Sequence, residues 1–179
     1  MGRQLKQLTQ PLIEFIEKQQ IFFVATAMED GRVNVSPKGL DSLRVINKNQ
    51  VIWLNLTGSG NETAIHLKNK NRITVMFCAF EGDPIILRLY GTAISYQKGT
   101  DFWEKNNALF SNIPGSRQLV DVTIENVQIS CGMGVPLMEY KEQRQSLIEW
   151  AENQGDEGLK KYWQKKNTTS IDGFNDLFE

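Results

Sequence analysis

The chain has 179 residues, enough for one domain with a full hydrophobic core and a small addition, but not for a second complete domain. Its 20 Lys and Arg residues nearly balance 21 Asp and Glu residues, so the sequence carries no global basic field that would gather nucleic acid or an acidic membrane surface. Residues 1–7 lack the apolar core of a signal peptide and no later run is long enough to span a bilayer, so we expect a cytoplasmic protein.

The first part of the chain predicts one helix followed by short strands. Apolar residues recur at helical spacing from residue 5, a proline fits the first turn, and we expect the helix to end near Gln19. Residues 21–28 are apolar on both faces, which predicts a strand covered on both sides. Residues 33–36 predict a half-buried strand, which Pro37 ends or confines to a sheet edge because it cannot donate to a ladder.

The middle of the chain predicts further strands and a single short helix. The segment Gly58-Ser59-Gly60-Asn61-Glu62-Thr63 leads into a compact helix over residues 63–68, with Ser59 and Glu62 in the order of a capping box. Turn residues separate the expected strands. These strands, which bring the count to six, are residues 42–46, 50–56, 73–80 and 85–96.

The strand near residues 120–129 carries a change of side-chain parity. Apolar residues occupy even positions up to 124 and odd positions from 127, which requires a bulge or bend near residues 125–126. Bends of this kind help to close barrels. With a further helical excursion at residues 102–110, the pattern predicts a mainly β (α+β) protein, a six-stranded antiparallel barrel with peripheral helices.

The composition changes beyond residue 136. Apolar residues then fall at helix-like intervals, and Gly155–Gly158 should divide this tail into two helices. We therefore expect a barrel domain at residues 1–136 and a C-terminal helical extension at residues 137–179 that packs on the barrel. Cys78 and Cys131 lie far apart without a CxxC or His/Cys cluster, which predicts ordinary buried thiols, no disulfide and no metal site.

The Gly-Ser-Gly turn before the short helix is the main candidate binding site. Gly58 and Gly60 let the backbone approach a ligand closely, and the first helical turn favours negative charge. Lys38 at a strand end and Arg88 inside an apolar run are cations whose burial is costly unless each meets an anion. Three alternatives stay open: the turn could merely cap the helix, Lys38 could be a solvated loop residue, and Arg88 could form a salt bridge on the sheet.

No catalytic set of side chains is recognisable in the sequence. His66 is the only histidine, and no neighbouring residue pairs with it as a metal ligand or a nucleophile. The nucleophile elbow GxSxG and the Walker-type phosphate loop are both absent. Any enzymatic activity would therefore have to come from a bound cofactor.

Five segments together resemble the pyridoxamine 5'-phosphate oxidase-like family: VSPKG at residues 35–39, VIWLN at 51–55, GSGNETA at 58–64, RITVMF at 72–77 and LRLYG at 87–91. The resemblance covers about residues 19–129 and implies a six-stranded split β-barrel, assembled as a homodimer with FMN in two clefts at the subunit interface. It implies phosphate contacts from strand-end and helix-mouth residues, and it puts residues 53–55 beside the isoalloxazine ring. The predicted cofactor-binding residues are Ser36, Pro37, Lys38, Trp53, Leu54, Asn55, Ser59, Gly60, Asn61, Thr63 and Arg88.

The sequence also departs from the pyridoxamine phosphate oxidases themselves. Gly60 and Asn61 stand where those enzymes carry a basic pair, and their C-terminal dimerisation segment is not recognisable, so we do not expect oxidation of pyridoxamine phosphate. Residues 130–136 and 170–173 match signatures of an uncharacterised subgroup. We expect an FMN-dependent oxidoreductase of an unidentified small molecule. The alternatives are a non-catalytic flavin-binding or storage module, and a barrel that binds a deazaflavin or haem, for which His66 is the only histidine available.

Overall fold

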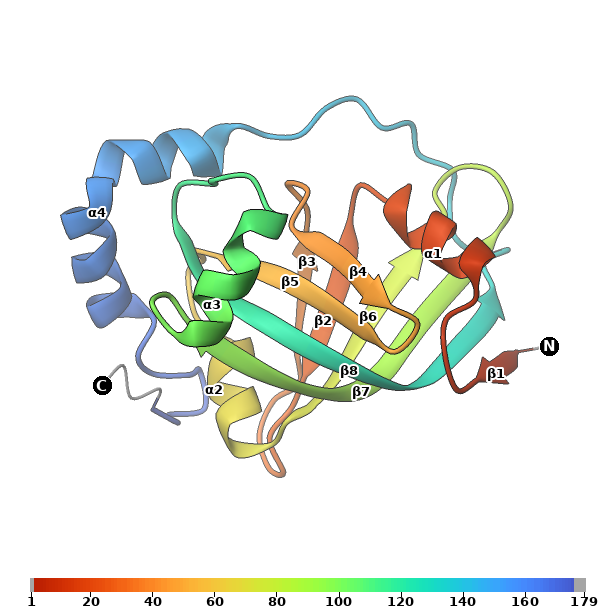
Figure 1. Ribbon diagram of the computed structural model, residues 1–179, viewed down its shortest axis with the longest axis horizontal. Coiled ribbons are helices and arrows are strands. Elements are labelled where there is room, and N and C mark those ends of the chain that lie inside the picture. Colours follow the sequence, from red (N-terminus) through yellow and green to blue (C-terminus); the bar gives the residue numbers. More distant parts are fainter. Residues whose placement is uncertain (1, 176–179) are drawn as a thin grey trace.

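The computed structural model describes residues 2–175, and Figure 1 shows a curved sheet with helices around its rim. The helices are α1 (Gln10–Glu17), α2 (Glu62–Asn69), α3 (Asp101–Asn106), a short 3-10 turn (Asn107–Leu109) and α4 (Ser146–Lys166). The strands are β1 (Arg3–Leu5), β2 (Phe22–Thr26), β3 (Asn34–Lys38), β4 (Leu43–Asn47), β5 (Gln50–Leu56), β6 (Arg72–Cys78), β7 (Ile85–Gln97) and β8 (Ser116–Cys131).

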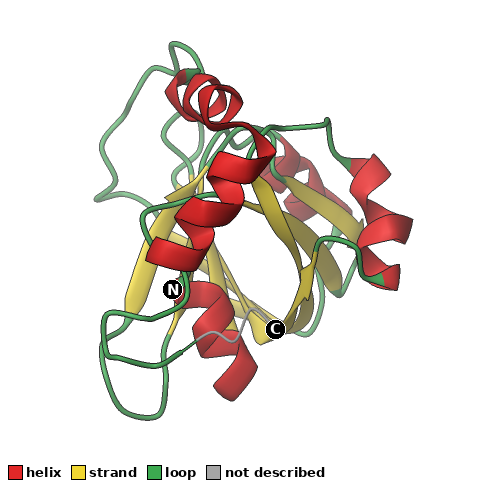
Figure 2. Ribbon diagram, turned by 90° about the vertical axis from the view of Figure 1, so that its left-hand side faces the viewer, coloured by secondary structure: helices red, strands yellow, loops and turns green. Residues whose placement is uncertain are grey.

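All pairings in the sheet are antiparallel, in the order β3-β2-β6-β7-β8-β5-β4, with β1 added to β8. The strands curl around a common axis (Figure 2). The two edge strands β3 and β4 are joined by a connection of only four residues, 39–42. The predicted antiparallel, barrel-like fold with peripheral helices is confirmed. The predicted count of six was low, because the sheet has eight strands. β1 lies where the sequence suggested the start of a helix, and β8 was recognised as a strand but was not included in the count.

The parity change in β8 is a β-bulge, as predicted. Tyr90 pairs with Asn126 and Gly91 pairs with Ile124, so Glu125 is the extra residue. The bulge keeps Ile124 and Val127 inside the core, at 2% and 0% exposure, although they have opposite parity. Because the bend brings the two backbones together, a Cβ at position 91 would lie 1.9 Å from the Thr123 carbonyl oxygen. The bulge therefore requires glycine at this position.

Of two predictions about the strands β2 and β3, at one edge of the sheet, the first was wrong and the second is confirmed. β2 is not covered on both faces, because its residues alternate between buried and half-buried positions. The physical reason is its place in the sheet, one strand from the open edge, where only one face meets the core. β3 is the edge strand itself and pairs only with β2, so Pro37 costs no ladder bond on its free side.

The helices cover the two ends of the barrel. α1 begins at Gln10 rather than at residue 5, has Pro11 in its first turn as predicted, and buries Leu12 and Ile16 against the core. α4 lies at the opposite end of the molecule from α1, as Figure 1 shows. It bends at Gly155, whose φ of 62° interrupts the helix, so the predicted division into two helices is confirmed. Residues 137–145 form neither helix nor strand, and residues 176–179 of the predicted extension lie outside the described residues.

Within residues 2–175, no helix combines the length and the apolar character needed to cross a membrane.

Candidate functional site

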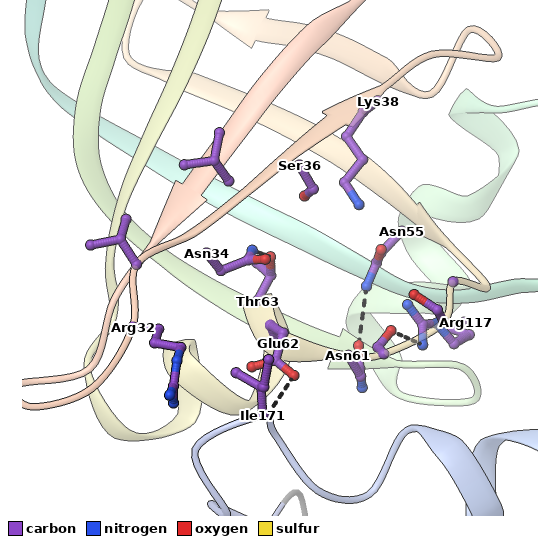
Figure 3. Close-up of a pocket in the computed structure, with 15 residues that line it drawn as sticks. Arg32, Asn34, Ser36, Lys38, Asn55, Asn61, Glu62, Thr63, Arg117 and Ile171 are labelled. Atoms are coloured by element: carbon purple, nitrogen blue, oxygen red, sulfur yellow. Dashed lines mark hydrogen bonds between the residues drawn. The ribbon is translucent and has the colours of Figure 1, made fainter.

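A cavity of about 510 Å³ lies between β3 and the turn that leads into α2, as Figure 3 shows. Seven of the eleven predicted residues line it: Ser36, Lys38, Asn55, Ser59, Gly60, Asn61 and Thr63. The sequence analysis did not select the remaining wall, which includes Arg32, Asn34, Glu62, Arg117 and Ile171. Segments distant in sequence, from β3, β5, β8 and the residues after α4, therefore meet around one space.

The strand β3 supplies the polar wall of the cavity through its alternation. Asn34, Ser36 and Lys38 share one parity, so their side chains lie on the same face of the strand, whereas Pro37 lies on the other face. The Asn34 side-chain amide donates to Thr63 Oγ1 at 3.2 Å and so connects β3 to the first turn of α2. This bond fixes the spacing of the two walls.

Lys38 is a titratable group of the site whose pKa is strongly lowered. Its ammonium lies 4.9 Å from the centre of the Trp53 ring, and among the described residues it has no carboxylate within ion-pair distance. Burial, and then the positive charge of Arg117, lower the pKa of Lys38 from 10.5 to about 8. A half-buried ammonium with a second cation nearby is costly in the absence of an anion. The site is therefore electrostatically suited to a negatively charged ligand.

The start of α2 differs from the predicted capping box. The N-cap is Asn61, which makes no side-chain capping bond, and Glu62 Oε1 instead accepts the backbone N–H of Ile171 at 3.0 Å. The prediction failed because residues after α4 reach Glu62 from outside the helix. Asn61 itself is 2% exposed, and the side-chain amide of Asn55 donates to its Oδ1 at 3.4 Å. The first turn of α2, which has orphan N–H groups and a positive helix-dipole end, thus faces the cavity without a capping side chain of its own.

Arg117 is the main residue that the sequence analysis missed. It lies on β8 with 3% exposure, and its guanidinium donates to the carbonyl oxygens of Leu56 and Gly60 at 2.9 and 3.2 Å. The signal that could have found it is the one that selected Arg88, an arginine within a largely apolar strand. Arg88 lies on β7, donates to Ser130 Oγ at 3.3 Å and does not line this cavity.

Three other predicted residues, Trp53, Leu54 and Pro37, lie near the cavity without lining it. Trp53 is 1% exposed and packs edge-on against Phe22 in the core, and Leu54 is 2% exposed. The backbone N–H of Leu54, in the segment expected beside the isoalloxazine ring, donates to the carbonyl oxygen of Ser42 at 2.8 Å. Of the three, Trp53 lies beneath the Lys38 ammonium. Their role in binding stays a prediction.

The histidine and the cysteines lie away from the cavity. His66 is 1% exposed, its Nδ1 lies 3.0 Å from Thr26 Oγ1, and it faces β2 rather than the cavity. Both cysteines are free, and Cys131 is exposed, so the prediction that it is buried was wrong. The reason is its position at the very end of β8, past the region that the core covers. Within residues 2–175, no three His, Cys, Asp or Glu side chains form a group that could hold a metal ion.

The protein is a split-barrel protein, in which an antiparallel sheet is curled into an open barrel and a cationic cavity lies at the start of the internal helix α2. Comparison with known proteins gives the family. The sequence profile described as pyridoxamine 5'-phosphate oxidase matches residues 8–131, and the chain belongs to this family. The chain is also 35% identical over 190 residues to the pyridoxamine 5'-phosphate oxidase family protein ustO of Aspergillus flavus, covering 95% of this chain and 76% of that protein.

Solved structures share the fold at low sequence identity. A putative pyridoxamine 5'-phosphate oxidase from Lactobacillus delbrueckii superposes with a TM-score of 0.55 at 19% identity, covering 69% of this chain and 94% of that chain. HutZ, a haem storage protein from Vibrio cholerae, superposes with a TM-score of 0.52 at 18% identity, covering 69% of this chain and 96% of that chain. At these identities the likeness establishes the fold alone.

Proposed function

We propose that this protein binds FMN in the cavity between β3 and α2, with the phosphate against Lys38 and the start of α2, and acts as a flavin-dependent oxidoreductase on a small molecule. The observation that carries the proposal is the half-buried Lys38, which has no carboxylate partner among the described residues and whose pKa is lowered to about 8. A lysine is tolerated in such surroundings where a ligand supplies the missing negative charge.

The cavity suits a phosphorylated small molecule in charge and in size. Lys38, Arg117 and the N-terminal end of α2 place three sources of positive potential around one space. Its volume of about 510 Å³ is within the range of roughly 300–1,000 Å³ of small-molecule sites. Gly60 and Asn61 replace the basic pair of the related enzymes, and in our proposal Lys38 and Arg117 supply that charge from two strands instead. The flavin would supply hydride or electron transfer, while these side chains bind and orient it.

The proposal includes a homodimer whose second subunit completes the cofactor site. Val33 is 68% exposed and Val35 is 61% exposed at the edge of the sheet, and both line the cavity. Apolar side chains at an unpaired sheet edge favour association with another chain. Light scattering of the purified protein measures the subunit number directly, and Val35→Lys should shift the protein toward the monomer.

Haem is a weaker candidate than FMN. Protein ligands of haem iron are His, Cys, Met or Tyr side chains. Within the described part of the chain, the residues that line the cavity include none of these four types, and His66 is buried against Thr26. Haem storage by the distant structural relative HutZ is therefore not carried over to this protein.

The test is a titration of the purified protein with FMN, followed through quenching of flavin fluorescence. We expect saturable binding, weakened about 10- to 100-fold by Lys38→Met, since a charge-assisted hydrogen bond contributes about 1.5–3 kcal/mol. The matched control is Lys48→Met, which removes an exposed lysine from the turn between β4 and β5. A deazaflavin is titrated in parallel. Anaerobic photoreduction followed by a series of electron acceptors separates an oxidoreductase from a storage module, because a storage module shows no selective turnover.

A further inference from the structure

The turn that leads into α2 is held by two buried side chains from distant parts of the chain. Arg117 donates to the carbonyl oxygens of Leu56 and Gly60, and the side-chain amide of Asn167 donates to the carbonyl oxygen of Gly58 at 3.2 Å. The two side chains also bind each other, because Arg117 Nη1 donates to Asn167 Oδ1 at 2.5 Å. Three alternate carbonyl groups of the turn are thus fixed by one pair of residues.

Asn167 is an unusual residue for the end of a helix. It follows α4 directly, it is 0% exposed, and its side chain uses both its donor and its acceptor on the barrel rather than on its own helix. One turn earlier on α4, the indole N–H of Trp163 donates to Thr57 Oγ1 at 2.9 Å. The end of α4 therefore holds residues 57 and 58 through two side-chain hydrogen bonds.

Fixing these carbonyl groups also fixes the direction of the backbone N–H groups. In a planar trans peptide unit the C=O of one residue and the N–H of the next point in opposite directions, and no cis peptide bond is present in the described residues. The Gly58 carbonyl held by Asn167 turns the Ser59 N–H the other way, and the Gly60 carbonyl held by Arg117 does the same for the Asn61 N–H. The same bonds keep carbonyl oxygens, which repel an anion, engaged with donors.

We infer that Asn167 and Arg117 are positioning residues that hold the backbone N–H group of Ser59 ready for an anion, so that the C-terminal helix takes part in forming the ligand site. The inference rests on the proposed phosphate site, and it assigns a role to a helix that never lines the cavity. It also makes the coupling reciprocal: an anion in the cavity stabilises the docking of the last turn of α4, and docking of that turn strengthens anion binding.

The test uses Asn167→Leu, which removes both side-chain bonds, and Asn167→Asp, which keeps the acceptor for Arg117 but sets a carboxylate oxygen against the Gly58 carbonyl. The matched control is Gln164→Leu, the same change from amide to leucine at an exposed position of α4. We expect FMN affinity to fall about 3- to 10-fold in Asn167→Leu, at a temperature at which all variants are folded, and to stay unchanged in Gln164→Leu. Arg117→Lys, which keeps the charge but cannot span two carbonyl groups, should lose affinity to a similar extent.

Hydrogen exchange separates this inference from the proposed function. In the FMN-free protein, Asn167→Leu should speed the exchange of the amides of residues 57–61, and Gln164→Leu should not. In the wild type, FMN should slow exchange in the last turn of α4, and this protection should vanish in Asn167→Leu. If the wild type fails to bind FMN, the proposed function falls and exchange in the FMN-free protein still decides whether Asn167 holds the turn. Unchanged exchange at residues 57–61, or wild-type FMN affinity in folded Asn167→Leu, overturns the inference.

Discussion

Lys38→Met should make the FMN-free protein more stable while weakening its binding of FMN. Burial and Arg117 lower the pKa of Lys38 from 10.5 to about 8, so the protonated side chain is less favourable in the folded protein than in the unfolded chain. A change of tenfold in a protonation equilibrium corresponds to about 1.4 kcal/mol, and allowing for the partial solvent access of Lys38, we expect the free energy of unfolding at pH 7 to rise by about 1–2 kcal/mol. Methionine keeps an unbranched stem over Trp53, so little packing is lost.

The pH dependence gives this prediction a definite sign. Below about pH 8 the amine is protonated in both states and the full cost is present. Between about pH 8 and the unfolded pKa of roughly 10.4, the folded protein has released the proton and the unfolded chain still binds it, so the free energy of unfolding of the wild type rises with pH. Lys38→Met lacks this rise.

Urea unfolding of FMN-free protein at pH 7 and at about pH 9.5, with Lys48→Met as the control, measures both effects. The wild type and Lys38→Met should converge in stability at the higher pH, while the control should follow the wild type at both. A Lys38→Met protein that is less stable than the wild type at pH 7, or that keeps the same pH dependence, would refute the reasoning. Burial of the protonated Lys38 side chain would then not destabilise the folded protein.

The remaining predictions concern ligand binding and the core. FMN affinity should be constant up to about pH 8 and should fall by up to tenfold per pH unit above it, because Lys38 loses its proton. Calorimetric titration of Lys38→Met should show no such decline. Gly91→Ala should lower the free energy of unfolding by more than about 3 kcal/mol or abolish folding, because its Cβ would meet the Thr123 carbonyl oxygen at 1.9 Å. The control Gly134→Ala, whose Cβ would have no atom within 4 Å, should be near neutral in thermal melts. Leu89→Ala, at 0% exposure, should cost about 2–5 kcal/mol in urea unfolding, and a cost below about 1 kcal/mol would place Leu89 outside the core.

Most features of the fold could be predicted from local sequence patterns. The parity change in β8 predicted the bulge at Glu125, because strand side chains alternate strictly and a core face cannot change sides without an extra residue. Pro37 predicted a sheet edge because it lacks a donor, and Gly155 predicted the interruption of α4. Each of these features is decided by one or two residues and their immediate neighbours.

The features that were missed depend on contacts between distant segments. Arg117 and Asn167 are 50 residues apart and meet only because α4 docks behind the turn at residues 56–60. Glu62 was expected to cap its own helix, but its carboxylate instead accepts the backbone N–H of Ile171, 109 residues away. The exposure of Cys131 follows from where the core stops covering β8. No periodicity in the sequence reports such contacts. The candidate site could therefore be located from the sequence, and Arg117 could have been selected as a buried charge, but its pairing with Asn167 could not be predicted.

The central claim is that the cavity binds the phosphate of a flavin through Lys38, and the most direct test compares FMN with riboflavin, which lacks only the phosphate. Titration of the wild type should give an affinity for FMN about 10- to 100-fold above that for riboflavin, and Lys38→Met should remove most of this difference. Equal affinities of the wild type for FMN and riboflavin, or a preference for FMN that persists unchanged in Lys38→Met, would contradict the account.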